Sequence, residues 1–570
     1  MKKKLLACTL AVLMCLQPAS AVLAEEPKPG DVAQTSEKVS ISSYSDLSDT
    51  AVSDDASSTD EDSSAVSDFS ASDTSETISD VDSADSNVDS ADSDLSEEGS
   101  VQELTEDFSD DVEDTEALTQ EESADEDSAQ EPEFDDGSVP SAGADANTFG
   151  DFQYTTSGLT ATITKYTGTA ASVTVPSKID NYTVTKIAYS AFANNLSLTS
   201  VVISDTITEI GSNAFEGCAA LKTLKLPSQL KTLGYGFISG TLVTTLTIPA
   251  GLAKCNSYNT YDSATSYGPL HGAENLTELI LTNGMEKIPD YLAWFSTSAT
   301  THLTSVSIPD SVTSIGSYSF ANCTALGELS LPDSVTSIDR DAFSGCKKLA
   351  SIRWSKDLQS IGISSFENCT ALETLSFPKS VKTIDSYAFR GCSSVSSLSF
   401  SDNPKSGFLT DIKYNAFENC TALENISFSK NINSLGSSAF SGCSSLEKVI
   451  LSDSITTIGS YAFSGCSALE SIKLPSKLKT LGYDFISGTL VTTLTIPAGL
   501  TTCDHSTYYY GPLNGAKNLT ELIIADGMEK IPDYLAWFST SETTHLTTIS
   551  IPDSVTSIGS YSFANCTALG

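Results

Sequence analysis

A period of 23 residues constrains this chain more than any other feature. Leu303, Leu326, Leu349 and Leu372 are each 23 residues apart, and so are the four cysteines that follow them, from Cys323 onward. A fixed period of this length is typical of a solenoid, in which one short unit stacks on the next. One unit has too little core to fold alone, so its apolar residues must be buried against neighbouring copies.

Each unit divides into a strand, a turn and a closing segment. In the copy from 303 to 325, Val306 and Ile308 alternate with polar residues, which is the pattern of a strand with one buried face. Pro309 ends that strand because it has no N–H for a β-ladder. The apolar residues of the turn and of the closing segment are expected to point inward: Val312, Ile315, Phe320 and Cys323. The pattern predicts a mostly β repeat solenoid.

The residue before each periodic cysteine is always glycine or asparagine. These two residue types adopt positive φ most readily, so we expect a left-handed backbone position where each coil closes. The positions are Gly217, Asn322, Gly345, Asn368, Gly391, Asn419, Gly442, Gly465 and Asn565. Asn-Cys-Thr also fits a glycosylation sequon. Glycine replaces the asparagine in other copies of the unit, however, and this argues against glycosylation.

Each unit follows the pattern L-x-x-h-x-h-P-x-x-h-x-x-I-x-x-x-A/S-F-x-G/N-C, where h is apolar. This pattern resembles the leucine-rich repeats of the BspA type, also called the Treponema pallidum type. The resemblance covers nearly all of the chain from about Phe149 onward. It implies a right-handed coil with one parallel β-sheet along one face of the solenoid. It also implies a surface or secreted protein of a bacterium or protist, and for several members adhesion to host matrix proteins or other microbes.

The first 24 residues read as a secretory signal peptide. Three lysines follow Met1, a short apolar run extends from Leu5 to Leu16, and cleavage is expected after Ala24 or Ala21. That run is too short to cross a bilayer, and no other segment reaches the necessary length, so we expect no membrane insertion. Too little apolar sequence precedes Cys8 for a lipoprotein site.

Residues 25–148 form an acidic segment rich in serine. It holds 40 Asp and Glu against Lys28 and Lys38, a net charge of −38 within the −44 of the chain. Such a segment is expected to stay disordered. A soluble spacer is one interpretation; weak binding of divalent cations and modification of the serines are others. The negative charge disfavours nucleic acid and anionic membranes as partners.

The cysteines are expected to be buried free thiols. Nine of the 13 occupy the repeat position, Cys255 and Cys503 lie elsewhere, and Cys8 and Cys15 belong to the signal. An exported chain with many cysteines suggests disulfides. However, equivalent side chains on stacked coils point the same way, which does not suit the torsion of a disulfide. A metal site is not predicted, because the four histidines form no ligand-spaced cluster with cysteine, and no cofactor is predicted.

A cap is expected before the solenoid, and two classes of departure from the 23-residue length occur within it. Residues 149–187, with expected strands at 149–154 and 161–166, are placed to cap the solenoid of 188–570. Residues 401–408 lengthen one coil. Leu226–Cys255 recurs as Leu474–Cys503, and Tyr267–Gly327 recurs as Tyr510–Gly570, so a long block begins a second time. Because the chain stops two residues into a repeat, we expect it to be a fragment.

Within each duplicated block, the pattern predicts one short helix. Ile288–Phe295 and its copy Ile531–Phe538 place Pro and Asp before apolar residues, which is a common helix start. Trp294 and Trp537, which lie inside these segments, are expected to fill the core.

Candidate partner-binding residues fall into two sets. The first is the outward side of the predicted sheet, which is rich in hydroxyl groups: Ser305, Ser307, Glu328, Ser330, Ser351, Arg353, Thr374 and Ser376. The second is a pair of loops rich in tyrosine, whose amphipathic side chain with few rotatable bonds suits recognition: Tyr258, Tyr261, Tyr267, Tyr508, Tyr509 and Tyr510. A loop packed only on itself is the alternative interpretation of the second set.

No catalytic constellation can be identified in the sequence, so an enzyme is not predicted. The acidic clusters lie where nothing would hold two carboxylates at a working distance, and no nucleophile elbow or phosphate loop occurs. The favoured hypothesis is a secreted or cell-surface protein that binds protein or glycoprotein ligands such as host matrix proteins and mucins. A structural surface coat or spacer is the alternative, and an exported enzyme with a repeat region is a third. The oligomeric state is not predicted.

Overall fold

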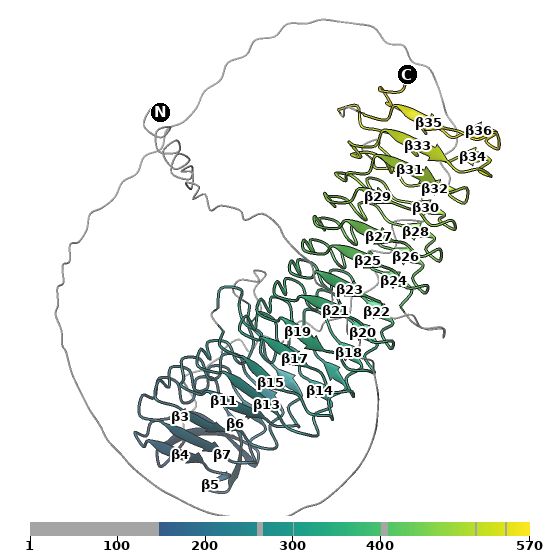
Figure 1. Ribbon diagram of the computed structural model, residues 1–570. Helices are drawn as coiled ribbons and strands as arrows, with labels where there is room; N and C mark the ends of the chain where they lie inside the picture. Colours follow the sequence, from purple (N-terminus) through teal and green to yellow (C-terminus); the bar gives the residue numbers. More distant parts are fainter. Residues whose placement is uncertain (1–146, 259–265, 300, 401–408, 508–509, 542–543) are drawn as a thin grey trace, which may run out of the picture. The chain divides into compact units, whose positions relative to one another are not determined.

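The structure, a computed structural model, describes residues 147–258, 266–299, 301–400, 409–507, 510–541 and 544–570. The predicted signal peptide, nearly all of the acidic segment and the 401–408 insertion lie outside these residues. Within them the chain forms 36 β-strands and no α-helix. The strands stand in two separate columns, one strand of each column in most coils (Figure 1). The chain is therefore a β-solenoid, as the 23-residue period predicts.

The first column, here called the strand face, contains the strands that the sequence predicts. In β17 the side chain of Leu329 is 3% exposed, while Glu328 and Ser330 on either side of it are exposed. The column consists of β4 (Ser172–Val175), β7 (Ser200–Ile203), β9 (Thr223–Lys225), β11 (Thr245–Ile248), β13 (Glu278–Leu281), β15 (Ser305–Ser307), β17 (Glu328–Ser330), β19 (Ser351–Arg353), β21 (Thr374–Ser376), β23 (Ser397–Ser399), β25 (Asn425–Ser427), β27 (Lys448–Ile450), β29 (Ser471–Ile472), β31 (Thr493–Ile496), β33 (Glu521–Ile524) and β35 (Thr548–Ser550).

The strands of the strand face pair in parallel along one face of the solenoid, as predicted, but their ladder is interrupted. The hydrogen-bonded ladder of the strand face is divided into β4-β7-β9, β11-β13-β15, β17-β19, β21-β23-β25-β27-β29 and β31-β33-β35. The breaks after β9 and β29 fall where a coil has 22 residues rather than 23. Nothing in the local sequence accounts for the breaks after β15 and β19.

The second column carries the longer continuous ladder, although its strands have only two residues. It joins ten successive coils from β14 to β32. In each of these strands the second residue is buried, as Ile315 shows at 0% exposed. The strands are β8 (Glu209–Ile210), β10 (Thr232–Leu233), β12 (Lys254–Cys255), β14 (Lys287–Ile288), β16 (Ser314–Ile315), β18 (Ser337–Ile338), β20 (Ser360–Ile361), β22 (Thr383–Ile384), β24 (Asp411–Ile412), β26 (Ser434–Leu435), β28 (Thr457–Ile458), β30 (Thr480–Leu481), β32 (Thr502–Cys503), β34 (Lys530–Ile531) and β36 (Ser557–Ile558).

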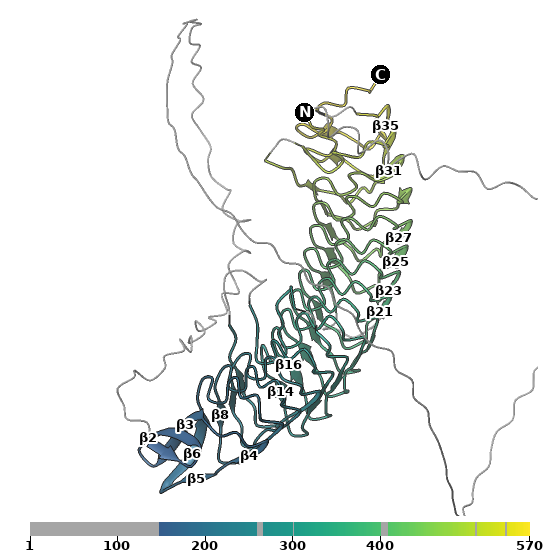
Figure 2. The same cartoon turned by 90° about the vertical axis from the view of Figure 1, so that its left-hand side faces the viewer.

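Longer strands stand at one end of the stack. β1 (Asn147–Phe149), β2 (Phe152–Ser157) and β3 (Thr160–Tyr166) pair antiparallel, and β5 (Lys178–Ile179) pairs antiparallel with β6 (Tyr182–Ile187). β3 then pairs parallel with β6, which continues into the two-residue column through β8. Figure 2 shows β2, β3, β5 and β6 together at this end, and β35 near the other. The expected pairing of strands near 149–154 and 161–166 is confirmed.

The third side of each coil is also hydrogen-bonded to its neighbour, although it contains no strand. The backbone N–H groups of Tyr318, Phe320 and Asn322 donate to carbonyl oxygens of the next coil at 3.0, 2.8 and 2.7 Å. Tyr318 and Asn322 have φ of 56° and 61°. All nine residues before the periodic cysteines have positive φ, as predicted. The second left-handed position, at Tyr318 and its equivalents, was not anticipated from the sequence.

The predicted helix at 288–295 is wrong, and the left-handed position explains why. Tyr291 has φ of 66°, which an α-helix does not accept. The N–H groups of Tyr291, Ala293 and Phe295 donate to the next coil at 2.9, 2.7 and 3.1 Å instead of to their own segment. Tyr534 repeats this geometry with φ of 65° in the second block. Trp294 and Trp537 are buried, as predicted.

The core is built from columns of identical side chains. Phe320 and Phe343 are both 0% exposed, and their ring centroids lie 5.3 Å apart. The stack continues through Phe366, Phe389, Phe417, Phe440 and Phe463 at centroid separations of 5.3 to 5.8 Å. The eleven described cysteines are free; all are buried except Cys566, which is partly exposed. The thiol of Cys346 donates to the carbonyl of Phe320 at 3.3 Å, so it behaves as a small apolar residue with a weak donor.

Candidate functional site

The first set of predicted partner-binding residues lies together on the strand face. Ser305, Ser307, Glu328, Ser330, Ser351, Arg353, Thr374 and Ser376 are all exposed, on β15, β17, β19 and β21. The pairing register places Ser330 beside Arg353. The hydroxyl of Ser399 on β23 donates to the hydroxyl of Ser376 at 3.1 Å. These residues form one exposed surface, even though the ladder beneath it is interrupted.

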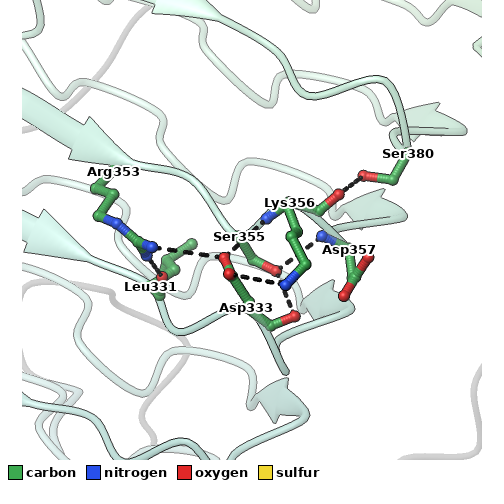
Figure 3. Close-up of polar contacts among 7 residues, drawn as sticks. All are labelled: Leu331, Asp333, Arg353, Ser355, Lys356, Asp357 and Ser380. Carbon is green, nitrogen blue, oxygen red and sulfur yellow. Dashed lines mark hydrogen bonds and ion pairs between the residues drawn. The ribbon is translucent and has the colours of Figure 1, made fainter. Parts of the chain in front are cut away.

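A cluster of two cations and one carboxylate lies at the edge of this surface. The guanidinium of Arg353 donates to the carbonyl of Leu331 at 2.6 Å and lies 3.6 Å from Asp333 Oδ1. The ammonium of Lys356 lies 2.9 Å from Asp333 Oδ2, and the Lys356 backbone N–H donates to Oδ1 at 3.3 Å. We call Arg353, Asp333 and Lys356 the basic turn (Figure 3).

Further hydrogen bonds hold the backbone of the basic turn. The hydroxyl of Ser355 donates to the carbonyl of Asp333 at 3.2 Å and accepts the N–H of Asp357 at 3.2 Å. The hydroxyl of Ser380, one coil further on, donates to the carbonyl of Lys356 at 2.7 Å. Figure 3 shows these contacts joining three consecutive coils. The positions of the two cations are therefore set by the stacking of the coils.

Two carboxylates act on the two cations of the basic turn. Hydrogen bonds from Lys356, together with the charges of Lys356 and Arg353, hold the pKa of the Asp333 carboxyl below its usual value. The hydrogen bond to Asp333 raises the pKa of Lys356, and the charge of Asp357 also acts on Lys356 and raises its pKa, so the charges at this turn balance. Exposed ion pairs add little to stability, because water screens them. The cluster therefore contributes little to holding the fold together.

An open groove begins beside the basic turn. Its volume is about 450 Å³, and it runs between the ends of neighbouring strands of the strand face. The residues that line it are Ile308, Asp310, Ser330, Pro332, Asp333, Ser334 and Arg353. Two of the predicted residues, Ser330 and Arg353, therefore share a concave surface with polar groups from three coils.

The second predicted set is only partly described. Tyr258 and Tyr267 exchange two backbone hydrogen bonds of 2.8 Å, and their rings stack at a centroid distance of 5.1 Å. The ring of Tyr267 also stacks on His271 at 3.8 Å. Tyr510 accepts the backbone N–H of Ser506 at 2.9 Å and forms the equivalent bridge in the second block. Tyr261, Tyr508 and Tyr509 lie outside the described residues.

Two other features bear on the chemistry of this surface. Among residues 147–570, with the gaps noted above, no three His, Cys, Asp or Glu side chains gather where they could hold a metal ion. The same residues contain no helix long and apolar enough to cross a membrane.

Comparison with known proteins places these features in a family. The family model described as "BspA type Leucine rich repeat region (6 copies)" matches residues 185–292, 294–407, 405–514 and 510–570, which is more than half of the chain. The chain belongs to this family. The predicted resemblance to BspA-type repeats is thereby confirmed. The search of curated proteins found no match.

Solved structures of bacterial leucine-rich repeat proteins resemble this BspA-type chain. A leucine-rich repeat protein from Bacteroides ovatus is 24% identical, with 67% of this chain and 95% of that chain covered and a TM-score of 0.47. A leucine rich cell surface protein from Faecalibacterium prausnitzii is 24% identical, with 67% and 94% covered and a TM-score of 0.35. The T. pallidum leucine rich repeat protein is 18% identical, with 57% and 91% covered and a TM-score of 0.19. At these identities the likeness shows the shared fold alone.

Sequence reasoning missed two members of the basic turn. Asp333 and Lys356 were not among the candidate residues, although they occupy the same position of consecutive BspA-type repeats, 23 residues apart. A change from acid to base at one repeat position brings opposite charges together in neighbouring coils, so the signal was available. Tyr235 was also missed; its ring lies 5.6 Å from that of Tyr258.

Proposed function

We propose that this BspA-type protein is exported to the cell surface and binds large protein or glycoprotein partners, such as host matrix proteins, mucins or other cells. In this proposal residues 1–24 direct export, 25–148 form an acidic spacer, 149–187 cap the solenoid, and 188–570 carry the binding surfaces. The antiparallel strands β1, β2 and β3 at one end of the two-residue column support the assignment of the cap.

The exposed strand face is the observation that carries this proposal. It presents short side chains with hydroxyl groups on consecutive coils, with their backbone held by the ladders and buried core beneath. A large partner that lies across several coils can form many modest hydrogen bonds with such a surface. Because the scaffold is rigid, little conformational entropy is lost when a partner binds.

The basic turn supplies the candidate anchor of this surface. Arginine is enriched among the residues that dominate binding energy at protein interfaces. Its planar guanidinium pairs well with a carboxylate or a sulfate of a glycoprotein. Arg353 is exposed, borders the groove, and is already held in place by Leu331 and Asp333. We therefore assign the largest single contribution on the strand face to Arg353.

The proposal is tested by measuring saturable binding of the full chain to a panel of immobilised extracellular-matrix proteins and mucins. Arg353→Ala is expected to weaken the binding of at least one partner by about tenfold or more, in line with residues that anchor interfaces. Arg390→Ala is the matched control. Arg390 also pairs with an acid, Glu367 at 2.6 Å, but it lies on the third side of the coil.

Equal loss of binding for Arg353→Ala and Arg390→Ala would remove the strand face from the proposal. If no member of the panel bound saturably, the binding function would be rejected. Self-association on a cell surface or in solution would then favour the structural coat, the alternative that the sequence leaves open.

A further inference from the structure

The third side of the coils carries two adjoining groups of aromatic rings that the strand face does not include. Tyr235, Tyr258 and Tyr267 contact one another at centroid distances of 5.1 to 5.9 Å. Tyr291, Trp294 and Tyr318 form an adjoining trio at 4.9 to 5.7 Å. The backbone N–H of Gly268 donates to the carbonyl of Trp294 at 2.8 Å and joins the two groups. We call these six residues the first aromatic band.

Several tyrosines of the band occupy a backbone conformation that does not suit them. Tyr291 and Tyr318 have φ of 66° and 56°. Positive φ is uncommon for any residue except glycine, and it is a clear outlier for a bulky side chain. Other coils place Asp341, Ser364 and Asn415 at the equivalent position, with the same sign of φ. The fold therefore does not require tyrosine there, and a residue kept against its backbone preference points to a role for its ring.

The second duplicated block builds the same arrangement again. Tyr534, Trp537 and Tyr561 contact one another at centroid distances of 4.9 to 5.9 Å, and Tyr534 and Tyr561 have φ of 65° and 55°. Tyr461, Tyr483 and Tyr510 form the adjoining group. We call these six residues the second aromatic band.

The coils between the bands differ at the same positions. In the coils formed by residues 326–445, the left-handed position holds Asp341, Ser364, Tyr387, Asn415 and Ser438. Tyr387 there contacts Tyr414 and Arg390 rather than a tryptophan. Among the described coils, clusters of tyrosine with tryptophan thus occur in the two duplicated blocks, whereas Trp354 between them packs on the core rings Phe366 and Phe377.

The tyrosine rings of the first band are partly accessible, whereas Trp294 is 6% exposed and packs against Tyr291 and Tyr318. Tyr258 is 39% exposed, and Tyr235, Tyr267, Tyr291 and Tyr318 are half-buried. The charges that act on these rings are mostly acidic: Glu216 on Tyr267, Asp290 on Tyr291 and Asp341 on Tyr318. Carboxylates beside the rings disfavour an anionic ligand.

These observations point to a neutral sugar chain. Pyranose rings present apolar C–H faces that pack on aromatic rings, while their hydroxyl groups bond to tyrosine hydroxyls and nearby polar groups. Rings repeated from coil to coil suit a polymer that lies along the stack. We propose that the two aromatic bands bind neutral polysaccharide chains. This deepens the proposed function at its tyrosine-rich surface and rests on it in placing the protein where such chains occur.

The test measures the mobility of the full chain in gels that contain a β-glucan, a starch, a galactomannan or an arabinoxylan, with anionic alginate as a comparison. Asparagine replaces tyrosine at left-handed positions of both bands: Tyr291→Asn, Tyr318→Asn, Tyr534→Asn and Tyr561→Asn. Asparagine accepts positive φ, so the variants are expected to fold. Tyr387→Asn makes the same change at the same backbone position outside the bands.

At least one neutral polysaccharide is expected to retard the wild-type chain. The four substitutions together should weaken this binding at least tenfold, whereas Tyr387→Asn and Arg353→Ala should leave it unchanged. Retardation by none of the neutral polymers, or only by alginate, would overturn the proposal. The proposal would also be overturned if the variant with all four substitutions still bound the neutral polysaccharide, or if it lost binding to proteins instead. Because Arg353→Ala tests the strand face separately, failure of one surface is distinguishable from failure of the other.

Discussion

At the scale of the residue, each repeated position of the unit has one structural role. The periodic phenylalanine fills the centre of its coil and stacks on its copies, and the periodic cysteine occupies a small buried space beside it. Burial raises the pKa of the Cys392 thiol to about 12, so this thiol stays protonated and unreactive. The sequence predicts these roles because every copy repeats the same residue in the same surroundings.

The first prediction concerns the phenylalanine column. Phe343→Ala removes a side chain that is 0% exposed and stacked on two neighbours, Phe320 and Phe366. We expect the cavity to cost about 3–5 kcal/mol. Thermal melting and hydrogen exchange should show the loss mainly in adjacent coils. An unchanged melting temperature would show that this ring is not part of the core.

The second prediction concerns Asp341, whose carboxyl lies at a left-handed position of the third side. Burial is the main cause that raises its pKa to about 6, with a further contribution from Glu367, while Tyr318 and Arg340 act in the opposite direction. The folded pKa exceeds the unfolded value of about 4, so folding favours the protonated form. Stability from this group is therefore present below about pH 4 and is lost as the pH rises through about 6.

Asp341→Asn should remove that dependence. The variant is expected to be more stable than the wild type at pH 8 by about 1–3 kcal/mol, and to differ little from it at pH 4. Chemical denaturation of both proteins at the two pH values measures the difference. A variant less stable at pH 8 would mean that the charge of Asp341 is favourable in the folded chain.

At the scale of the element, neighbouring coils constrain one another at the closing turn. Three asparagines that precede a periodic cysteine are followed by glycine one coil later: Asn322 by Gly345, Asn368 by Gly391 and Asn419 by Gly442. A Cβ atom at Gly345 would overlap the side chain of Asn322, which is held by a 2.8 Å hydrogen bond to the Phe295 carbonyl. From Asn322 to Gly442 the two residues therefore alternate, and the alternation has a steric cause; after Gly442, glycine follows glycine at Gly465.

The third prediction follows from this packing. Gly345→Asn places asparagine over asparagine and should destabilise the chain by about 1–3 kcal/mol, the range for overpacking. Gly465→Asn is the matched control, because its Cβ would lie 3.4 Å from the Cα of Gly442, an ordinary contact. Melting temperatures compare the two variants. Equal destabilisation would show that backbone conformation, not the neighbouring side chain, sets the cost.

At the scale of the whole molecule, stability is a sum of coils and the contacts between them. Three backbone ladders and several side-chain columns repeat from coil to coil, so one complete unit can be removed without changing the register of the others. What changes is which residues become neighbours across the new junction.

The fourth prediction compares two deletions of 23 residues each. Deleting 349–371 places Gly391 over Gly345, and the chain should fold with a melting temperature close to that of the wild type. Deleting 326–348 places Asn368 over Asn322, so this shorter chain should be markedly less stable, and Asn368→Gly should restore it. Circular dichroism and thermal melting distinguish the two. Identical behaviour would mean that the alternation has no energetic consequence.

The sequence alone determined much of this protein. Each coil packs on copies of itself, so a residue that repeats in the sequence is surrounded by its own copies in the fold. For this reason the period, the buried columns and the left-handed position at Asn322 could all be predicted. The tertiary structure decided the rest. Tyr291 prevents a helix only because its N–H finds a partner in the next coil. The basic turn and the aromatic bands likewise depend on which side chains different coils bring together, and a single unit does not contain that information.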